Sequence, residues 1–380
     1  MITGINVKNF KSLADFSLPV EMFTCLIGLN GAGKTTVLQV LDFIGHLVCG
    51  ITDFRGWKKG ELITNGSNSR TIFLQVDFIV AGNRKCSWSG RYNIDKQRFT
   101  EEKIIDSEPD TSFPNTYLQL KENRLVYDGM SSSEFPKDIS DYDYKGSVLS
   151  AFKFEDPVIQ AIKKELQSLK SLELLSPNSL RRASLPSDTL GIGGEGLSGY
   201  LSKLKSEDED LLQGLQRYFY PQTGKYEIKR KKFGWKDILL RENSLKSSVP
   251  ATHINDGYLR ILAILSQRYS VADFLLFDEI ENGINQELIE KLLVQLQNFN
   301  GKQVLVTTHS ALVLNYLSDE AAKKGVVLLY KDLVGYTRAV KFFEIPQIAE
   351  QMEFMAPGQI MSQTDLIKLS SNLCGTGGVK

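Results

Sequence analysis

The chain has 380 residues, of which 42% are hydrophobic and 24% are charged, and its 45 basic and 45 acidic side chains cancel. This hydrophobic content is enough for a large buried core and argues against extended disorder. The zero net charge excludes a general attraction to nucleic acid, so any site of that kind must be a local patch.

The four cysteines are dispersed and form no C-x-x-C pair: Cys25, Cys49, Cys86 and Cys374. This spacing argues against a disulfide framework or a zinc site. The N-terminus does not have the pattern of a signal peptide, and no apolar stretch reaches the length of a membrane span. We therefore expect a cytoplasmic protein that does not associate with a membrane.

The first 80 residues predict three strands and a helix. Ile5 and Val7 alternate with polar neighbours, as in a half-buried strand. The apolar run 23–27 indicates a buried strand that ends at Gly28, and residues 71–80 have an extended pattern. Thr35 opens a helix whose apolar residues recur along one face: Val37, Leu38, Leu41, Ile44 and Val48.

A hairpin is predicted at 117–120 and 125–127. Residues 106–115 carry two prolines and several small polar side chains, which is typical of a loop. The polar stretch around 131–133 predicts a boundary, after which the character of the sequence changes.

Helices are predicted over 158–175 and 197–218, the second with a solvated acidic run at 207–210. The glycine-rich segment 191–196 is interpreted as a flexible loop, because no clear strand precedes it as a dinucleotide-binding turn requires.

From residue 251 onward the pattern returns to alternating helices and buried strands. The predicted organisation is a first lobe part at 1–128, an inserted mainly helical lobe at 129–250, a second lobe part at 251–345 and a tail at 346–380. No internal repeat or sustained heptad pattern is present.

The strongest chemical signal is Gly28-Leu-Asn-Gly-Ala-Gly33-Lys34-Thr35, which matches the phosphate-loop pattern G-x-x-x-x-G-K-[ST]. A buried strand precedes it and an amphipathic helix follows, which disfavours a chance match in a glycine-rich turn. Glycines let backbone N–H groups wrap phosphates, and the helix N-terminus adds partial positive charge. Lys34 is expected to reach the β- and γ-phosphates, and the Thr35 hydroxyl is expected to bind Mg²⁺.

The second signal is an apolar strand at 274–277 that ends in two adjacent carboxylates, Asp278 and Glu279. Asp278 suits a role at Mg²⁺, and Glu279 suits a general base that activates the attacking water. Considered alone, the pair could equally be solvated acids at a strand end. The phosphate loop favours the catalytic interpretation.

A third apolar strand leads into Thr307-Thr-His309-Ser310, where His309 could hydrogen-bond the γ-phosphate or the water; the alternative is an ordinary polar strand end. Asn255-Asp256-Gly257 precedes the helical pattern 258–265. Taken alone, it is better explained as a helix cap, in which Asn255 or Asp256 caps and Gly257 permits close backbone approach.

These motifs, in this order, resemble the ABC-type ATPases of the SMC, RecF and OLD-nuclease group. The opening Ile5-Asn-Val-Lys-Asn-Phe10-Lys11-Ser12 and the run Asp278-Glu-Ile-Glu-Asn-Gly283-Ile284 also carry the resemblance. It covers about 1–128 and 250–330. It is strongest to short ATPases of this group without coiled coils, many of them from bacterial antiphage systems.

The resemblance implies an α/β fold, namely an ABC-type P-loop NTPase head with a mixed sheet and an inserted, mainly helical lobe. It implies ATP and Mg²⁺ as cofactors, Glu279, Lys34 and His309 as catalytic residues, and Thr35 and Asp278 as metal ligands. The nucleotide contacts that it implies are Lys11, Asn30, Gly31, Ala32, Gly33, Lys34, Thr35, Thr36, Asn255 and Gly257. Asn255 and Gly257 would contact the γ-phosphate of ATP held by a second subunit.

The sequence departs from the family pattern at two places. Asn255 stands where the family has a serine, and Ile284-Asn285-Gln286 replaces the usual Leu-His-Pro. Both departures affect the contacts expected across the dimer. The glutamine that couples the lobes in this family is not identified, since Gln75 and Gln119 both lie in apparent strands.

The expected function is an ATP-dependent switch that forms a homodimer or higher oligomer and controls a separate effector such as a nuclease or toxin. No nuclease constellation is recognised in the sequence. One alternative is a DNA-binding repair ATPase, for which 229–232 and Arg181-Arg182 are candidate basic patches. Another is the ATPase subunit of a transporter, which the absence of Ser-Gly-Gly-Gln disfavours.

Overall fold

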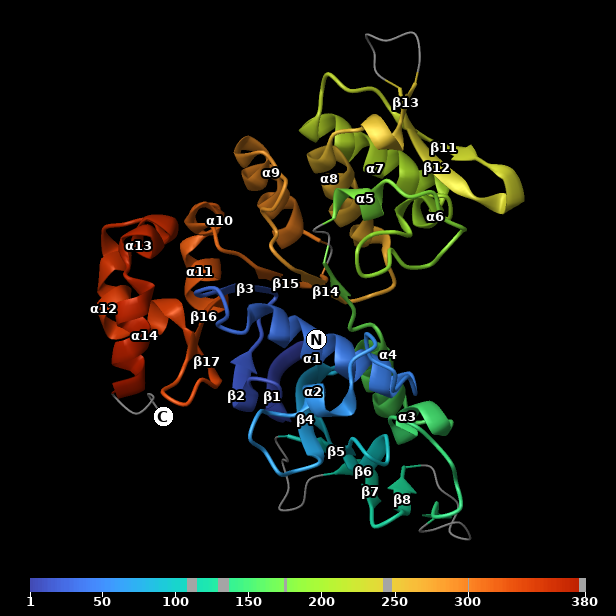
Figure 1. Ribbon diagram of the computed structural model, residues 1–380, viewed down its shortest axis with the longest axis vertical. Helices are drawn as coiled ribbons and strands as arrows, with labels where there is room; N and C mark the ends of the chain where they lie inside the picture. The colour runs from blue at the N-terminus through green and yellow to red at the C-terminus, as the bar shows by residue number, and fades with distance from the viewer. Residues whose placement is uncertain (108–114, 129–136, 174–175, 242–247, 300, 376–380) are drawn as a thin grey trace. The chain divides into compact units, whose positions relative to one another are not determined.

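The computed structural model describes residues 1–107, 115–128, 137–173, 176–241, 248–299 and 301–375 (Figure 1). It divides the chain into two units. Unit 1 comprises Met1–Leu169, Lys323–Glu353 and the described residues from Gln363 onward, and unit 2 comprises Lys170–Ala322 and Phe354–Ser362.

An antiparallel sheet of eight strands forms much of unit 1, in the order β2-β1-β4-β5-β6-β7-β8-β9. Its strands are β1 (Ile2–Phe10), β2 (Leu13–Pro19), β4 (Thr71–Val80), β5 (Arg84–Asn93), β6 (Arg98–Asp106), β7 (Thr116–Lys121), β8 (Arg124–Tyr127) and β9 (Lys137–Asp138). Burial alternates along β4, so one face is packed. The strands predicted at 5–7 and 71–80 and the hairpin at 117–127 are confirmed.

The remaining strands of unit 1 carry the predicted phosphate loop. Strand β3 (Phe23–Ile27) is buried throughout and pairs in parallel with β16 (Val326–Lys331), which pairs antiparallel with β17 (Thr337–Lys341). This mixed pairing agrees with the expected fold class. The helices are α1 (Lys34–Val48), α2 (Lys59–Leu62), α3 (Val148–Ala151), α4 (Pro157–Gln167), α12 (Pro346–Ala349) and α14 (Leu366–Gly375), and α11 (Asp319–Gly325) leads in from unit 2.

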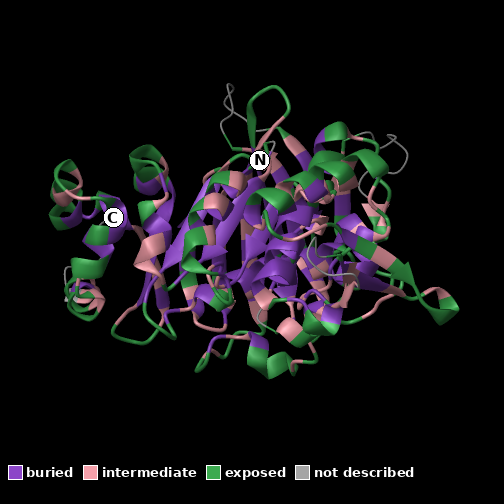
Figure 2. Ribbon diagram, turned by 90° about the horizontal axis from the view of Figure 1, so that it is seen from above, coloured by how far each residue is buried: buried purple, intermediate pink, exposed green. Residues whose placement is uncertain are grey.

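Helix α1 packs through aromatic side chains on the eight-stranded sheet. Phe43 stacks on Phe10 of β1, with ring centroids 5.4 Å apart, and meets the edge of Tyr92 of β5. Buried residues gather in the sheets and on the inner faces of helices, whereas exposed residues lie on outer helix faces and loops (Figure 2). Because α1 follows the phosphate loop directly, this packing also fixes the loop.

Unit 2 contains the parallel strands β10 (Ser171–Leu172), β14 (Phe274–Phe277) and β15 (Gln303–Thr307), with β14 in the middle. A separate sheet consists of β11 (Tyr226–Arg230), β12 (Lys236–Leu240) and β13 (Val249–Pro250). Its helices are α5 (Pro177–Leu180), α6 (Leu197–Leu201), α7 (Ser206–Phe219), α8 (Asp256–Ser266), α9 (Gln286–Gln297), α10 (Ala311–Asn315) and α13 (Pro357–Gln363).

The units are divided differently from the predicted lobes. Residues 137–169 group with unit 1, where α4 packs against α1, and residues 251–322 group with 170–250. The predicted boundary at 129, with the polar stretch 131–133, lies outside the described residues, as does most of the loop predicted at 106–115. The predicted tail contains α12, α13 and α14.

Two helix predictions were too long. The helix predicted over 158–175 ends at Gln167, because Ser171 and Leu172 pair with β14 as a short parallel strand. The helix predicted over 197–218 is interrupted between α6 and α7, where Lys205 has extended backbone. The inserted segment, expected to be mainly helical, also carries the sheet of β11, β12 and β13. Among the described residues, no helix is long and apolar enough to cross a bilayer.

Candidate functional site

The phosphate loop connects β3 to α1 through backbone that favours glycine. Gly28, Gly31 and Gly33 have φ angles of 143°, 79° and 111°. A side chain on Gly33 would collide with Thr337, whereas the corresponding space at Gly31 is open. The loop therefore presents an open, backbone-lined surface at Gly31, next to the N-terminus of a helix of 15 residues. This is the arrangement that binds phosphate oxygens.

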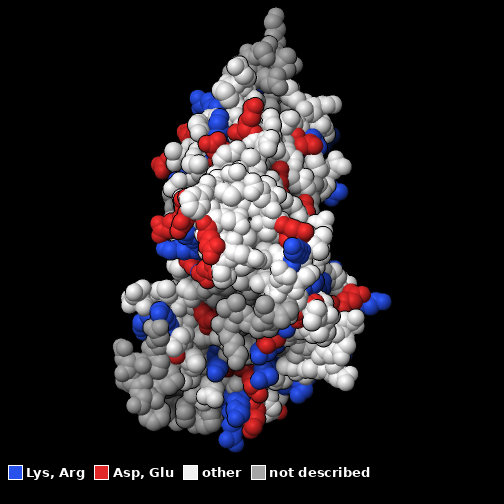
Figure 3. Space-filling model, turned by 90° about the vertical axis from the view of Figure 1, so that its left-hand side faces the viewer, with Lys and Arg blue, Asp and Glu red and all other residues white. Residues whose placement is uncertain are grey.

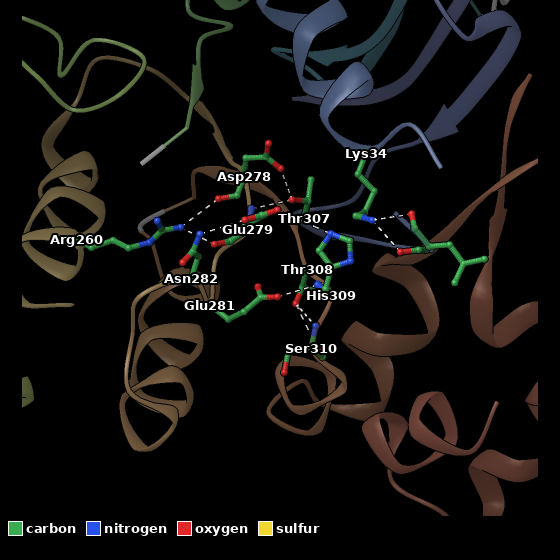
Figure 4. A network of polar contacts seen from close by, with 12 residues as sticks. Lys34, Arg260, Asp278, Glu279, Glu281, Asn282, Thr307, Thr308, His309 and Ser310 are labelled. Carbon is green, nitrogen blue, oxygen red and sulfur yellow. Dashed lines mark hydrogen bonds and ion pairs between the residues drawn. The ribbon is translucent and has the colours of Figure 1, made fainter. Parts of the chain in front are cut away.

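Lys34 lies in the first turn of α1 and is only 6% exposed. Its Nζ donates hydrogen bonds to the carbonyl oxygens of Gly28 (2.8 Å) and Leu29 (3.2 Å), drawn as dashed lines in Figure 4. These contacts hold the ammonium group against the loop. Thr35 follows on the exposed side of the helix, and Thr36 is half-buried.

Thr337 of β17 supports the phosphate loop through hydrogen bonds, a role that the sequence did not reveal. Its buried hydroxyl donates to the carbonyl of Ala32 (2.9 Å), pairs with the Ser12 hydroxyl (2.8 Å) and accepts from Lys331 Nζ (2.9 Å). The Thr337 amide also donates to the Ser12 carbonyl (2.8 Å). The loop is thus tied to residues more than 300 positions away.

Lys11 points to α1 and to an aromatic side chain. Its Nζ donates to Gln39 Oε1 (3.2 Å) and lies 3.0 Å from the centroid of the Trp57 ring. The expected nucleotide contact of Lys11 would therefore compete with a cation–π contact.

A cavity of about 330 Å³ lies next to the phosphate loop, within unit 1. It is lined by Leu29, Asn30, Gly31 and Ala32 of the loop, by Leu329, Tyr330, Lys331, Asp332 and Leu333 of the β16–β17 hairpin, and by Ile367, Ser370, Ser371 and Cys374 of α14. The exposed side of the loop, with Asn30 and Gly31, therefore faces open space.

In unit 2, parallel pairing of β14 and β15 brings Asp278 and Glu279 close to the segment that carries His309. Phe277 pairs with Val306, so Asp278 and Thr307 leave the same edge of the sheet. The Thr307 hydroxyl donates to Asp278 Oδ1 (2.5 Å) and accepts from the Glu279 amide (2.8 Å). Asp278 is buried, with 4% exposure. Thr307 therefore fixes both acids relative to the next strand (Figure 4).

Glu279 has left-handed backbone, with φ of 46°, which is unusual for a residue with a side chain. Its side chain is 38% exposed, lies 3.9 Å from His309 Nε2 and accepts a hydrogen bond from Asn282 Nδ2 (3.2 Å). The two acids thus have different environments, one buried and one accessible to water. The accessible carboxylate beside an imidazole suits proton transfer.

Arg260 of α8 is a functional candidate that sequence reasoning missed. Its Nη2 donates to the backbone carbonyls of Asp278 (3.2 Å) and Glu279 (2.5 Å). Burial lowers its pKa to about 10, although the carboxylates of Glu281, Glu279 and Asp278 act in the opposite direction. At neutral pH it remains a buried cation behind the acidic turn. A single arginine within the apolar run 258–265 was the available signal.

His309 is held through its backbone. Its amide donates to Glu281 Oε1 (2.8 Å), and Ser310 continues the turn with a bond from its amide to the Thr308 hydroxyl (3.0 Å). Glu281 therefore orients the histidine loop from the segment that follows Glu279. This role was also absent from the sequence prediction.

The predicted signature segment caps α8, with Asn255 Oδ1 accepting from the Tyr258 amide (3.3 Å). A cavity of about 480 Å³ is lined by Arg181, Thr252, His253, Ile254, Asn255, Asp256, Gly257 and Gly283. Arg181 pairs with the Asp256 carboxylate and donates to the Ile254 carbonyl (2.9 Å). The capping and the binding interpretations are therefore compatible, because Asn255 is exposed as well as capping.

The expected Mg²⁺ ligands fit that ion in kind. Mg²⁺ commonly uses one or two carboxylates with phosphate and water oxygens, and Thr35 and Asp278 supply a hydroxyl and a carboxylate. Within the described part of the chain, no group of three His, Cys, Asp or Glu side chains could hold a metal.

Of the other sequence candidates, Gln75 and Gln119 lie in β4 and β7 as expected, and the segment 191–196 is a loop before α6. The basic run 229–232 lies on the β11–β12 hairpin, and Arg181-Arg182 follows α5. None of these joins the contacts around Asp278 and Glu279 that are described above.

Two family models match the sequence, one described as an AAA ATPase domain over residues 1–189 and one as an AAA domain, putative AbiEii toxin, Type IV TA system, over residues 131–315. An OLD nuclease from Thermus scotoductus is 46% identical over 78 residues, which are 20% of this chain and 14% of that protein. The chain thus spans only a small part of that relative's length.

Among solved structures, an SMC head bound to the C-winged helix domain of ScpA matches with a TM-score of 0.55 and 13% identity. The match covers 89% of this chain and 96% of that one. The SMC head domain from Thermotoga maritima matches with a TM-score of 0.47 and 11% identity, over 89% and 98% of the two chains. Together, the two family models, the OLD match and the SMC-head fold support an ABC-type ATPase of the SMC, RecF and OLD group.

Proposed function

We propose that this chain is an ATP-driven switch. It binds ATP with Mg²⁺, closes on a second copy around the nucleotide, hydrolyses the ATP and thereby controls a separate effector in bacterial antiphage defence. The catalytic part of the proposal rests on the acidic turn after β14. There the Thr307 hydroxyl bonds the Asp278 carboxylate and the Glu279 amide, and Arg260 bonds the Glu279 carbonyl. These hydrogen bonds keep the catalytic groups in place before the substrate binds.

In this proposal each residue has a defined task. The loop amides and Lys34 balance the negative charge of the phosphates, and His309 donates a hydrogen bond to the γ-phosphate. Glu279 accepts a proton from water as the water oxygen bonds the γ-phosphorus and ADP leaves. Thr35 and Asp278 would hold Mg²⁺, which neutralises phosphate charge. The exposed position of Glu279 supports its assignment as the base rather than Asp278.

The substitution Glu279→Gln tests this assignment. It keeps the size of the side chain but removes the proton acceptor, so we expect ATP hydrolysis to fall by about 10²–10⁴-fold. ATP affinity is expected to stay near the wild-type value, because Glu279 lies outside the phosphate loop. Phosphate release and nucleotide binding are measured on the same preparations.

Asn282→Ala is the matched control, since it removes only the hydrogen bond to Glu279. We expect it to retain most of the activity. Wild-type turnover in Glu279→Gln would reject Glu279 as the base.

The effector part of the proposal rests on the resemblance and on the relatives. The matched protein from Thermus scotoductus is named a nuclease, and the SMC head of the matched structure is bound to a domain of another protein. These names support a head that passes its nucleotide state to a further activity. Purification of tagged Glu279→Gln from its native host, with and without ATP, tests this point. If no other protein copurifies with the tagged chain in an ATP-dependent manner, this result would count against a separate effector.

A further inference from the structure

The β11–β12 hairpin is a narrow two-stranded ribbon whose outer end projects beyond the helices of its own unit (Figure 1). At the inner end of the hairpin Tyr226 pairs with Leu240, and at the outer end Arg230 pairs with Lys236. Strand β13 pairs only with the inner end, at Leu239 and Leu240. A bond from the Lys231 amide to the Trp235 carbonyl (2.7 Å) closes the turn. The tip is therefore a defined structure, and on the β12 side it is held at Lys236 by a backbone bridge to Ser184.

The tip exposes two aromatic rings. Phe233 is 92% exposed and Trp235 is 43% exposed. Burying a phenylalanine side chain typically stabilises a fold by about 2 kcal/mol, so folding gains little from Phe233 here. Phe233 also has left-handed backbone, with φ of 57°, which is rare and costly for a bulky residue. Folding alone does not explain an aromatic residue at this position.

The same tip concentrates positive charge in a chain of zero net charge. Four consecutive basic residues, Lys229 to Lys232, are exposed, and Lys236 pairs across from Arg230. Only Lys231 of these four has an ion pair among the described residues, with Asp237. Elsewhere, on the face shown in Figure 3, acidic and basic side chains are interspersed. The hairpin is thus a local basic patch of the kind that attracts a polyanion.

The basic patch also contains a groove. An open groove of about 630 Å³ is lined by Ala183, Lys229, Arg230, Lys231, Lys232 and Trp235. Cations and an indole ring therefore face the same space. An acidic peptide would use the cations, but it would leave the exposed rings without partners. Phosphates with neighbouring unstacked bases match both features, because bases stack on aromatic side chains while lysines and arginines contact the backbone.

We propose that the β11–β12 hairpin binds nucleic acid with unpaired bases, with Phe233 and Trp235 as stacking surfaces and Lys229, Arg230 and Lys232 as phosphate contacts. This goes beyond the ATPase switch and does not depend on it. The hairpin belongs to unit 2 and involves none of the residues assigned to nucleotide. Binding is therefore measured on the full chain without ATP, so failure of one proposal is separable from failure of the other.

The experiment measures fluorescence anisotropy with a labelled oligothymidine of about 30 nucleotides and a duplex of equal length. We expect tighter binding of the single strand, and an affinity that falls steeply between about 50 and about 200 mM salt. Phe233→Ala should weaken single-strand binding about 5- to 100-fold without changing the salt slope. The double variant Lys229→Gln with Lys232→Gln should instead reduce the slope of log affinity against log salt concentration by about 1.4, because two phosphate contacts are lost.

The matched controls are Phe354→Ala and Lys323→Gln, which remove an exposed phenylalanine (85% exposed) and an exposed lysine that are not part of the hairpin. Neither should change binding. Failure of the wild type to bind either oligonucleotide at low salt overturns the proposal. Loss of binding to phosphatidylserine vesicles in Phe233→Ala, with oligonucleotide binding unchanged, assigns the hairpin to a membrane surface and also overturns it.

Discussion

At the scale of single residues, the site depends on threonine hydroxyls that contact two partners at once. Thr307 bonds both Asp278 and Glu279, and Thr337 of β17 ties the phosphate loop to Ser12 in the turn between β1 and β2. A hydroxyl can donate and accept together, which neither valine nor alanine can replace. The left-handed backbone of Glu279 costs energy, and Thr307 and Arg260 supply the contacts that hold it.

Thr337→Val tests whether the loop needs this support. The substitution keeps the shape of the side chain but leaves the Ala32 carbonyl and Lys331 without their hydroxyl partner. We expect ATP affinity to fall about tenfold, corresponding to about 1.4 kcal/mol, while single-turnover hydrolysis of bound ATP changes little. Calorimetry and single-turnover kinetics measure the two effects.

Thr337→Ser is the control, since it restores the hydroxyl and should bind ATP nearly as the wild type does. Equal affinity in the valine and serine variants would show that the loop does not need the hydroxyl.

At the scale of elements, α8 combines a cap with a predicted contact to a second subunit. Asn255→Asp keeps the size and the capping oxygen but adds a negative charge where a phosphate of the other subunit is expected. We expect ATP-dependent dimerisation to be lost and ATP binding by the single chain to be retained. Asn255→Ser, which restores the family residue, should dimerise. Light scattering with ATP in the Glu279→Gln background measures this, and association of the aspartate variant would exclude the contact.

The eight-stranded sheet contains a buried acid, Glu102, beneath α3. Burial raises its pKa to about 7, although it accepts bonds from the Ser147 hydroxyl, Trp88 Nε1 (2.8 Å) and the Val148 amide (3.0 Å). The native state therefore keeps a proton that the unfolded chain loses near pH 4.5. Stability should fall as pH rises from about 4.5 to about 7, by up to about 3 kcal/mol, and this contribution is constant outside that interval.

Glu102→Gln should remove this part of the pH dependence, because its amide does not titrate. Thermal unfolding of both proteins between pH 5 and pH 8 makes the comparison, with Glu101→Gln on the exposed side of the same strand as the control. An equally steep fall in the Glu102→Gln protein would assign the dependence to other groups.

At the scale of the whole molecule, the proposal links nucleotide binding to association. Lys34→Ala removes the ammonium group that lies against the phosphate loop, so both ATP binding and ATP-dependent dimerisation should be lost. Gly257→Arg should retain ATP binding and lose dimerisation. The two variants should differ in calorimetry and coincide in a sizing experiment.

The structure shows that Gly257→Arg also affects a neighbouring loop. A Cβ at this position would lie 3.0 Å from the Gly283 carbonyl, so the arginine also displaces that loop. Asn255→Asp provides the independent check, because it adds no atoms. Dimerisation of Gly257→Arg on adding ATP, as in the parent protein, would contradict the ABC-type dimer.

The sequence determined the parts of the site that depend on local pattern. A phosphate loop needs glycines at specific positions, and a buried strand needs a short apolar run, so β3, α1 and the acidic turn after β14 were all predicted. The fold class was implied by the family resemblance that these motifs carry. Each of these features is encoded within about ten neighbouring residues.

Only the tertiary structure decided which residues support the site and where the helices end. Thr337 reaches Ala32 across 305 positions, and Arg260 reaches Glu279 across 19. The helix predicted through 175 ends early because Ser171 pairs with Leu276, a partner from a distant strand. Hydrogen bonds of this kind depend on which chain segments pack together, and local amphipathic patterns carry no information about that pairing.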